Sequence, residues 1–284
     1  MVSFTNNLKT VALLGLMMGL FMLAGFVLTG NIYGLTFALV LGAIFSGGAW
    51  LFSDKIAIGA MRGQEIRPEH DRDLHTMIER LSKNAGIPTP RLYRCPQDAP
   101  NAFATGPWPS RSAVAVTDGA LRLLSYEELE GVIAHELAHV RNRDTLISTV
   151  AAVVAGVFSY LPYLLMFGFG GGRQSPFGMV GVLAFVILSP IAAVLIQMAI
   201  SRSREFVADA DGATIAGSPH GLISALQKLD NVSRRVPMQG EMPTANHMFI
   251  VQPLSAGGNG FAGLFTTHPR TADRVAALQK HAMA

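Results

Sequence analysis

Cysteine and charge are what this sequence has least of. Its 284 residues include one cysteine, Cys95, so no disulfide can form within the chain, which agrees with a reducing compartment. Charged residues make up 14% of the chain, whereas hydrophobic residues make up 50%. A chain with this balance is too apolar for an ordinary soluble enzyme.

Charge is missing altogether from three long runs, residues 10–53, 145–172 and 174–201. Because a membrane-spanning helix needs about 20 apolar residues, the first run, with a natural turn at Gly30-Asn31, predicts two spans and the others predict one each. The last two could also be buried core helices, but uncharged stretches of 23 residues favour a membrane. A secretory signal peptide fits poorly, since the first apolar region is too long and lacks a cleavage site with small residues. The four predicted spans are Thr10–Thr29, Ile32–Phe52, Leu146–Gly168 and Gly178–Ile200.

Basic residues predict how the chain is oriented. Twelve lie in residues 53–145 and eight in residues 201–284, whereas the connection 170–175 has one and the turn at Asn31 has none. Since Lys and Arg mark the cytoplasmic side of a membrane, both polar segments and both termini are expected in the cytoplasm. The net charge of +3 therefore reflects topology and does not indicate nucleic acid, which we do not expect as a partner. The expected organisation is two spans in residues 1–52, a cytoplasmic part in 53–145, a hairpin of two spans in 146–200 and a second cytoplasmic part in 201–284.

One helix is well signalled in the first polar segment. Ser125 followed by Glu128 forms a capping box, and the acidic residues of this first turn suit the helix dipole. No proline or glycine follows Gly131 until Gly156, so the helix is expected to be continuous through residues 135–139.

Residues 135–139 read His135-Glu136-Leu137-Ala138-His139. Residues four apart share one helix face, with about 5–6 Å between their Cβ atoms, so His135 and His139 are predicted to bind one zinc ion. Glu136 is then placed to face a water on the metal rather than the metal itself. Three specified residues in five also arise by chance, and a catalytic zinc has three protein ligands, so a third ligand is required.

The third ligand is expected downstream of the predicted hairpin. A metzincin would have glycine at 142 and histidine at 145, but this chain has Asn142 and Thr145. His139 lies seven residues before the third predicted span, and Glu205 lies five residues after the fourth. If both spans form an antiparallel hairpin whose helices continue outwards, at about 1.5 Å per residue both side chains stand roughly 7–10 Å beyond the same membrane face. Glu205 is therefore predicted as the third ligand.

A second carboxylate, Asp209, follows Glu205 by one helical turn. There it can orient a ligand histidine through the ring nitrogen that does not bind metal. In the alternative interpretation, both carboxylates pair with Arg202 and Arg204 on a solvated face.

Three short runs before the capped helix are β-like: Arg91–Arg94, Asn101–Thr105 and Ser112–Thr117. Prolines at 96, 100, 107 and 109 keep the sheet small, so it must contain an edge. An exposed edge strand can pair with an extended peptide, although most such edges are only solvated. The predicted fold class is mainly α with a small β-sheet (α+β), four transmembrane helices and a cytoplasmic zincin-like domain with the metal motif on a helix.

Several motifs together resemble the HtpX-type integral-membrane zinc metalloproteases, relatives of the CAAX prenyl proteases and the mitochondrial Oma-type proteases. The likeness covers essentially the whole chain. The motifs are His135–His139, Arg204–Asp209, Asn101–Gly106, and Thr267-His268-Pro269 with Arg274.

The resemblance implies roles for these motifs. It implies that His135, His139 and Glu205 bind one Zn2+ per chain and that Glu136 is the catalytic acid and base. It also implies that His268 and Arg274 lie near the active site, where either could donate to the developing oxyanion. The edge strand that receives the substrate backbone would be formed by Asn101, Ala102, Phe103, Ala104 and Thr105.

The expected function is zinc-dependent hydrolysis of peptide bonds at the cytoplasmic face of the bacterial inner (plasma) membrane, by a multi-pass protein in contact with the lipid bilayer. The resemblance implies protein or peptide substrates, membrane proteins and misfolded proteins among them, and a role in quality control. The alternative is a non-enzymatic membrane scaffold or chaperone stabilised by zinc. A structural zinc site usually closes with a fourth protein ligand and has no need of an unliganded Glu136, which favours the enzyme.

Overall fold

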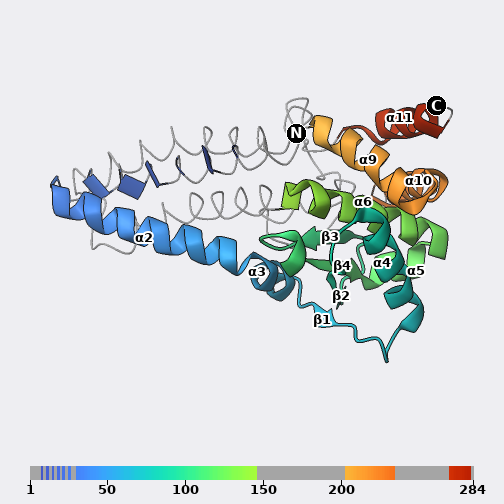
Figure 1. Ribbon diagram of the computed structural model, residues 1–284, viewed down its shortest axis with the longest axis horizontal. Helices are drawn as coiled ribbons and strands as arrows, with labels where there is room; N and C mark the ends of the chain where they lie inside the picture. Colours follow the sequence, from blue (N-terminus) through green and yellow to red (C-terminus); the bar gives the residue numbers. More distant parts are fainter. Residues whose placement is uncertain are drawn as a thin grey trace. The chain divides into compact units, whose positions relative to one another are not determined.

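The structure is a computed structural model that describes residues 30–145, 202–233 and 269–282, and ten positions between residues 8 and 26 (Figure 1). Most of the first predicted span, the whole third and fourth predicted spans and His268 lie outside these residues. A helix, α2 (Ile32–Leu51), is found where the second span is predicted. Within the described part of the chain, no helix combines the length and the apolar character needed to cross a membrane. The described residues fall into two compact units, one with α2 up to Trp50 and the other with all remaining labelled elements.

The second unit contains a four-stranded sheet in the order β1-β2-β4-β3. β2 and β4 are parallel, and the other two pairs are antiparallel. The three β-like runs are confirmed as β2 (Arg91–Cys95), β3 (Ala102–Thr105) and β4 (Ala113–Thr117). β1 (Gln64–Glu65) was not predicted, because two exposed polar residues carry no alternation. β3 lies at the edge of the sheet, as expected.

The central strand β4 is buried on both faces. Its alternating side chains enter two cores: Val114 and Val116 join the main core, while Ala113 and Ala115 join a smaller one with Phe103. The helix α3 (Ser53–Ala60) contributes Ile58 to the smaller core. Helices α4 (Arg72–Ala85), α6 (Tyr126–Asn142), α10 (His220–Ser233) and α11 (Thr271–Ala282) contribute to the main core, and the short helices η1 (Pro109–Arg111) and α5 (Asp118–Leu123) flank β4. A mainly helical fold with a small sheet is therefore confirmed.

α6 is the helix around which this unit is built. It begins at the predicted capping box: the side chain of Ser125 accepts from the N–H of Glu128, and the Glu128 carboxylate accepts from the N–H of Ser125. α6 packs against β3, α4, α10 and α9 (Arg202–Ala216), which surround it in Figure 1. Two glycines let α10 approach closely, since a Cβ on Gly131 would lie 2.4 Å from the backbone N of Leu222 and one on Gly221 would lie 2.1 Å from the carbonyl O of Glu127.

The end of α6 differs from the prediction. The helix carrying His139 was expected to continue towards the third span, and this is wrong: α6 ends at Asn142, and Arg143 takes a left-handed conformation with φ 61° and ψ 28°. The N–H of Arg143 is bonded to the carbonyls of His139 and Val140, which closes the last turn. His135 and His139 still share one continuous helix. The break instead changes where the next residue, Asp144, is placed.

Candidate metal centre

Three predicted ligands meet at the contact between α6 and α9. One ligand atom each from His135, His139 and Glu205 lies within 4.8 Å of the other two. The two Nε2 atoms are 3.1 Å apart, Nε2 of His139 is 3.6 Å from Oε1 of Glu205, and Nε2 of His135 is 3.8 Å from Oε2 of Glu205. Ligand atoms at zinc-binding distances in a tetrahedron are about 3.3 Å apart. The observed separations therefore fit a zinc ion, which takes nitrogen and carboxylate ligands of this kind.

Gly212 lets the two ligand-bearing helices come this close. A Cβ on Gly212 would lie 2.9 Å from Cα and 3.0 Å from the backbone N of His135. His135 and Glu205 are both almost fully buried at this contact. The alternative in which Glu205 and Asp209 pair with arginines on a solvated face does not describe this arrangement, because both carboxylates are buried and face the histidines.

Asp209 lies beside the ring of His135. Its Oδ1 is 3.0 Å from Nδ1 of His135, a close contact that lacks the alignment of a hydrogen bond. Arg274, which is 1% exposed, donates from Nε (2.8 Å) and Nη2 (2.6 Å) to the two oxygens of Asp209. Burial alone would raise the pKa of Asp209, but the charge and hydrogen bonds of Arg274 lower it to about 2. The structure thus brings Arg274 to the site, as the resemblance implied.

The second ligand histidine has a partner that sequence reasoning missed. Nδ1 of His139 is hydrogen-bonded to Oδ2 of Asp144 at 3.0 Å, and Nη1 of Arg204 lies 3.4 Å from the other oxygen of Asp144. Burial opposes a charge on His139, but the Asp144 hydrogen bond and the surrounding carboxylates raise its pKa to about 9 as long as no cation is bound. Asp144 follows His139 by five residues, which on a continuous helix is the wrong face, so no periodic signal could have found it.

The charges of the site favour a cation. Four carboxylates and two guanidinium groups are gathered here, so two negative charges remain when both histidines are neutral, as metal ligands are, and a divalent metal would neutralise them. The carboxylates are Glu136, Asp144, Glu205 and Asp209, and the guanidinium groups are Arg204 and Arg274. Buried charges without partners are costly, so this excess agrees with the ligand distances.

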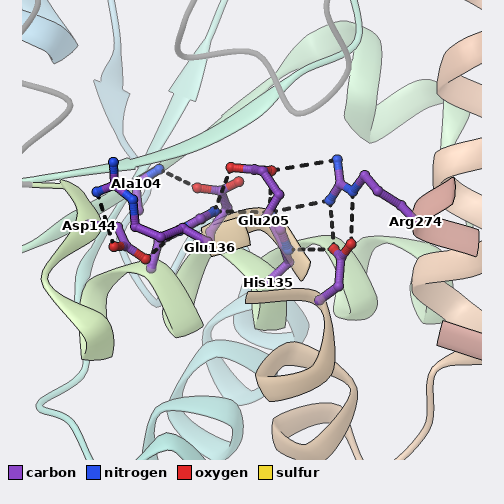
Figure 2. A network of polar contacts seen from close by, with 9 residues as sticks. Ala104, His135, Glu136, Asp144, Glu205 and Arg274 are labelled. Carbon is purple, nitrogen blue, oxygen red and sulfur yellow. Dashed lines mark hydrogen bonds and ion pairs between the residues drawn. The ribbon is translucent and has the colours of Figure 1, made fainter. Parts of the chain in front are cut away.

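Glu136 lies apart from the three ligand atoms, beside the edge strand. Its Oε2 accepts a hydrogen bond of 2.9 Å from the backbone N–H of Ala104 (Figure 2). This N–H belongs to the free edge of β3, and the side chains of Ala102, Phe103 and Thr105 are buried. The backbone of Asn101 is not at the site, since its N–H and carbonyl are bonded to Thr117.

Comparison with known proteins gives the site a context. The family model described as Peptidase family M48 matches residues 68–282. Proteins named Protease HtpX homolog are similar over nearly the whole chain: that of Desulfatibacillum aliphaticivorans is 48% identical (96% of this chain, 89% of the relative), and that of Pelotomaculum thermopropionicum is 46% identical (98% and 100%). Among solved structures, S. mikatae Ste24p shares the fold with a TM-score of 0.54 at 17% identity, over 98% of this chain and 66% of that one.

Proposed function

This chain belongs to peptidase family M48 and is a metalloprotease, and we propose that it is a zinc-dependent endopeptidase integrated in the bacterial inner membrane, with its site facing the cytoplasm. His135, His139 and Glu205 would hold the zinc ion, and Glu136 would be the acid and base. The observation that carries these roles is the meeting of one ligand atom each from His135, His139 and Glu205 within 4.8 Å of one another, next to a second carboxylate, Glu136, that is bonded to β3.

Each residue has a distinct task in the reaction. Bound zinc would polarise the scissile carbonyl and lower the pKa of a water to near 7. Glu136 would take the proton of that water and pass it to the leaving amine; since Oε2 is held by Ala104, Oε1 remains for this transfer. The β3 edge would align the substrate backbone as an added strand.

Arg274 is placed to position the ligands. Its Nε and Nη2 donate to Asp209, its Nη2 also lies 3.4 Å from Nε2 of His135, and its Nη1 lies 3.8 Å from Oε2 of Glu205. We therefore assign donation to the oxyanion to His268, on the resemblance alone, and assign to Arg274 the task of holding Asp209 behind His135.

The membrane setting is supported by the three uncharged runs, which contain the four predicted spans, and by the basic residues that flank them. α2 contains no charged residue, and its large apolar side chains Ile32, Tyr33, Phe37, Val40 and Ile44 are each more than half exposed. Exposed apolar surface of this extent suits lipid better than water. We retain the predicted organisation: spans in residues 1–52 and 146–200, catalytic parts in 53–145 and 201–284. We further propose that its substrates are membrane proteins and misfolded proteins and that it acts in protein quality control.

The full chain, purified in detergent and loaded with zinc, tests the catalytic roles. Glu136→Gln should abolish cleavage of an unfolded protein and leave the zinc content, measured by mass spectrometry, at one ion per chain. Glu127→Gln, on the exposed start of the same helix, is the matched control and should cleave normally. Equal turnover by wild type and Glu136→Gln would refute the mechanism, and absence of cleavage by the zinc-loaded wild type would favour the scaffold alternative. Release of the protein from membranes at alkaline pH would refute the membrane setting.

A further inference from the structure

Each of the two ligand histidines has an aspartate at Nδ1 and an arginine behind that aspartate. For His135 these are Asp209 and Arg274, at 3.0 Å and 2.6 Å. For His139 they are Asp144 and Arg204, at 3.0 Å and 3.4 Å. The contact between Asp144 and His139 is the better aligned of the two, because it is a hydrogen bond, whereas Nδ1 of His135 has no hydrogen bond to Asp209.

The position of Asp144 depends on the break at the end of α6. Five residues after His139 on an unbroken helix, its side chain would point roughly 140° away from the metal-binding face. The left-handed Arg143 turns the chain so that Asp144 returns under His139. A non-glycine residue at positive φ is uncommon and costs free energy unless other contacts stabilise it. Here it creates the contact to a ligand.

We infer that Asp144 is a positioning residue of the metal centre, clamped by Arg204. By accepting a hydrogen bond from Nδ1–H of His139, Asp144 leaves the Nε2 lone pair to the metal and fixes the plane of the ring. This inference rests on the proposed metal site and extends it to Asp144, which no motif includes, and to Arg204, for which the motif implied no role.

Arg204 adds a second connection. It precedes the ligand Glu205 on α9, while Asp144 follows the α6 turn that carries His139, and the ion pair joins positions 60 residues apart. The exposed fractions of Asp144 and Arg204 are 5% and 8%. Because solvent screens a buried pair little, the pair can hold the two ligands close together, with Nε2 of His139 3.6 Å from Oε1 of Glu205.

The chain offers a matched control on the same two helices. Asp211 of α9 is paired with Arg141 (2.7 Å) and accepts a hydrogen bond from Asn142 (2.8 Å), so it also joins α6 to α9. Asp211 is more exposed than Asp144, and its partners are Arg141 and Asn142 rather than a ligand histidine. A variant at Asp211 therefore weakens helix docking without removing the partner of His139.

The test measures zinc affinity of the full chain in detergent by competition with a chromophoric chelator. Asp144→Ala should bind zinc about 10–100-fold more weakly, and Asp211→Ala should stay within about threefold of wild type. The Co2+-loaded Asp144→Ala protein should also show altered visible absorption bands, which reflect ligand geometry, whereas Co2+-loaded Asp211→Ala should keep the bands of wild type. Asp144→Asn, whose amide can still accept from Nδ1–H, should lie between the two and serves if the alanine variant fails to fold.

Arg204 is tested through a double variant. If Arg204 acts through Asp144, Arg204→Met should weaken zinc binding alone but add no further loss to Asp144→Ala. Wild-type affinity in Asp144→Ala, an equal loss in Asp211→Ala, or fully additive losses in the double variant would each overturn the inference. Absence of zinc binding by wild type would instead refute the proposed metal site, so the two failures are distinguishable.

Discussion

Gly212 sets the distance between α9 and the turn of α6 that carries the first ligand, and its substitution gives the sharpest test of this geometry. A Cβ there would lie 2.9 Å from Cα and 3.0 Å from N of His135, whereas ordinary contact begins at 3.4 Å. Gly212→Ala must therefore move the helices apart locally by about 0.5 Å, because the atoms in the way are backbone atoms in a closely packed interior.

The displacement reaches the ligands directly. His135 is the residue contacted, and Glu205 lies seven residues earlier on α9, on nearly the same face. Catalytic groups must be held within about 0.5 Å of their productive geometry, and a misplacement of about 1 Å can cost about 100-fold in rate. We expect kcat/KM to fall at least about tenfold and zinc to bind more weakly. The free energy of unfolding should change less than the activity does. Overpacking costs about 1–3 kcal/mol, and alanine in a helix offsets up to about 1 kcal/mol of this relative to glycine.

The assay compares Gly212→Ala with Gly59→Ala, both made in the full chain. A Cβ on Gly59, which is also helical, meets nothing within 4 Å, so this control should match wild type in zinc affinity and cleavage. Circular dichroism of both variants checks that the helices are retained. Wild-type cleavage and zinc affinity in Gly212→Ala would show that the close approach of α9 does not position the ligands.

Three further changes follow from single contacts. Arg274→Met should lower the free energy of unfolding by about 3–5 kcal/mol, because Asp209 then stays buried without its cation; chemical denaturation in detergent measures this, and a double variant with Asp209→Asn that recovers nothing would count against it. Burial alone would raise the pKa of Glu128, but an ion pair and hydrogen bonds lower it; its stabilisation is thus complete above the unfolded-state pKa and lost as pH falls through the lower folded value. In Glu128→Gln the melting temperature should therefore fall less steeply as the pH is lowered. The same pH dependence as in wild type would contradict this. Ala104→Pro removes the donor to the acid/base carboxylate on the free side of β3, so kcat should fall while zinc content stays at the wild-type level; normal kcat would exclude this role for the edge amide.

The features that could be predicted from the sequence are those that local chemistry determines. The capping box places the start of α6, and the four-residue spacing then brings both imidazoles to one face. The alternating residues of 113–116 predict a strand, and prolines around it predict a small sheet with an edge. These features depend only on neighbours within one helical turn or one strand.

The rest depends on a backbone conformation and on contacts between distant residues. Nothing about Arg143 indicates a left-handed residue, since glycine and asparagine are the usual choices there, so neither the end of α6 nor the return of Asp144 could be foreseen. The prediction of Glu205 depends on a hairpin whose spans lie entirely outside the described residues and on a helix that in fact ends at Asn142. Arg274 could be placed only by resemblance, because 65 residues separate it from Asp209.

The position of Glu136 separates an enzyme from a structural zinc site. A structural site closes its coordination with a fourth protein ligand, yet among the described residues only three side chains form a group that could hold a metal. Glu136 is the carboxylate nearest in sequence to both histidines, and it is turned to the Ala104 amide on the sheet edge. A carboxylate kept beside the metal, outside the ligand set and at the strand where a peptide would be added, has no purpose in a scaffold. It has one in peptide hydrolysis, where a base must act between the metal and the substrate backbone.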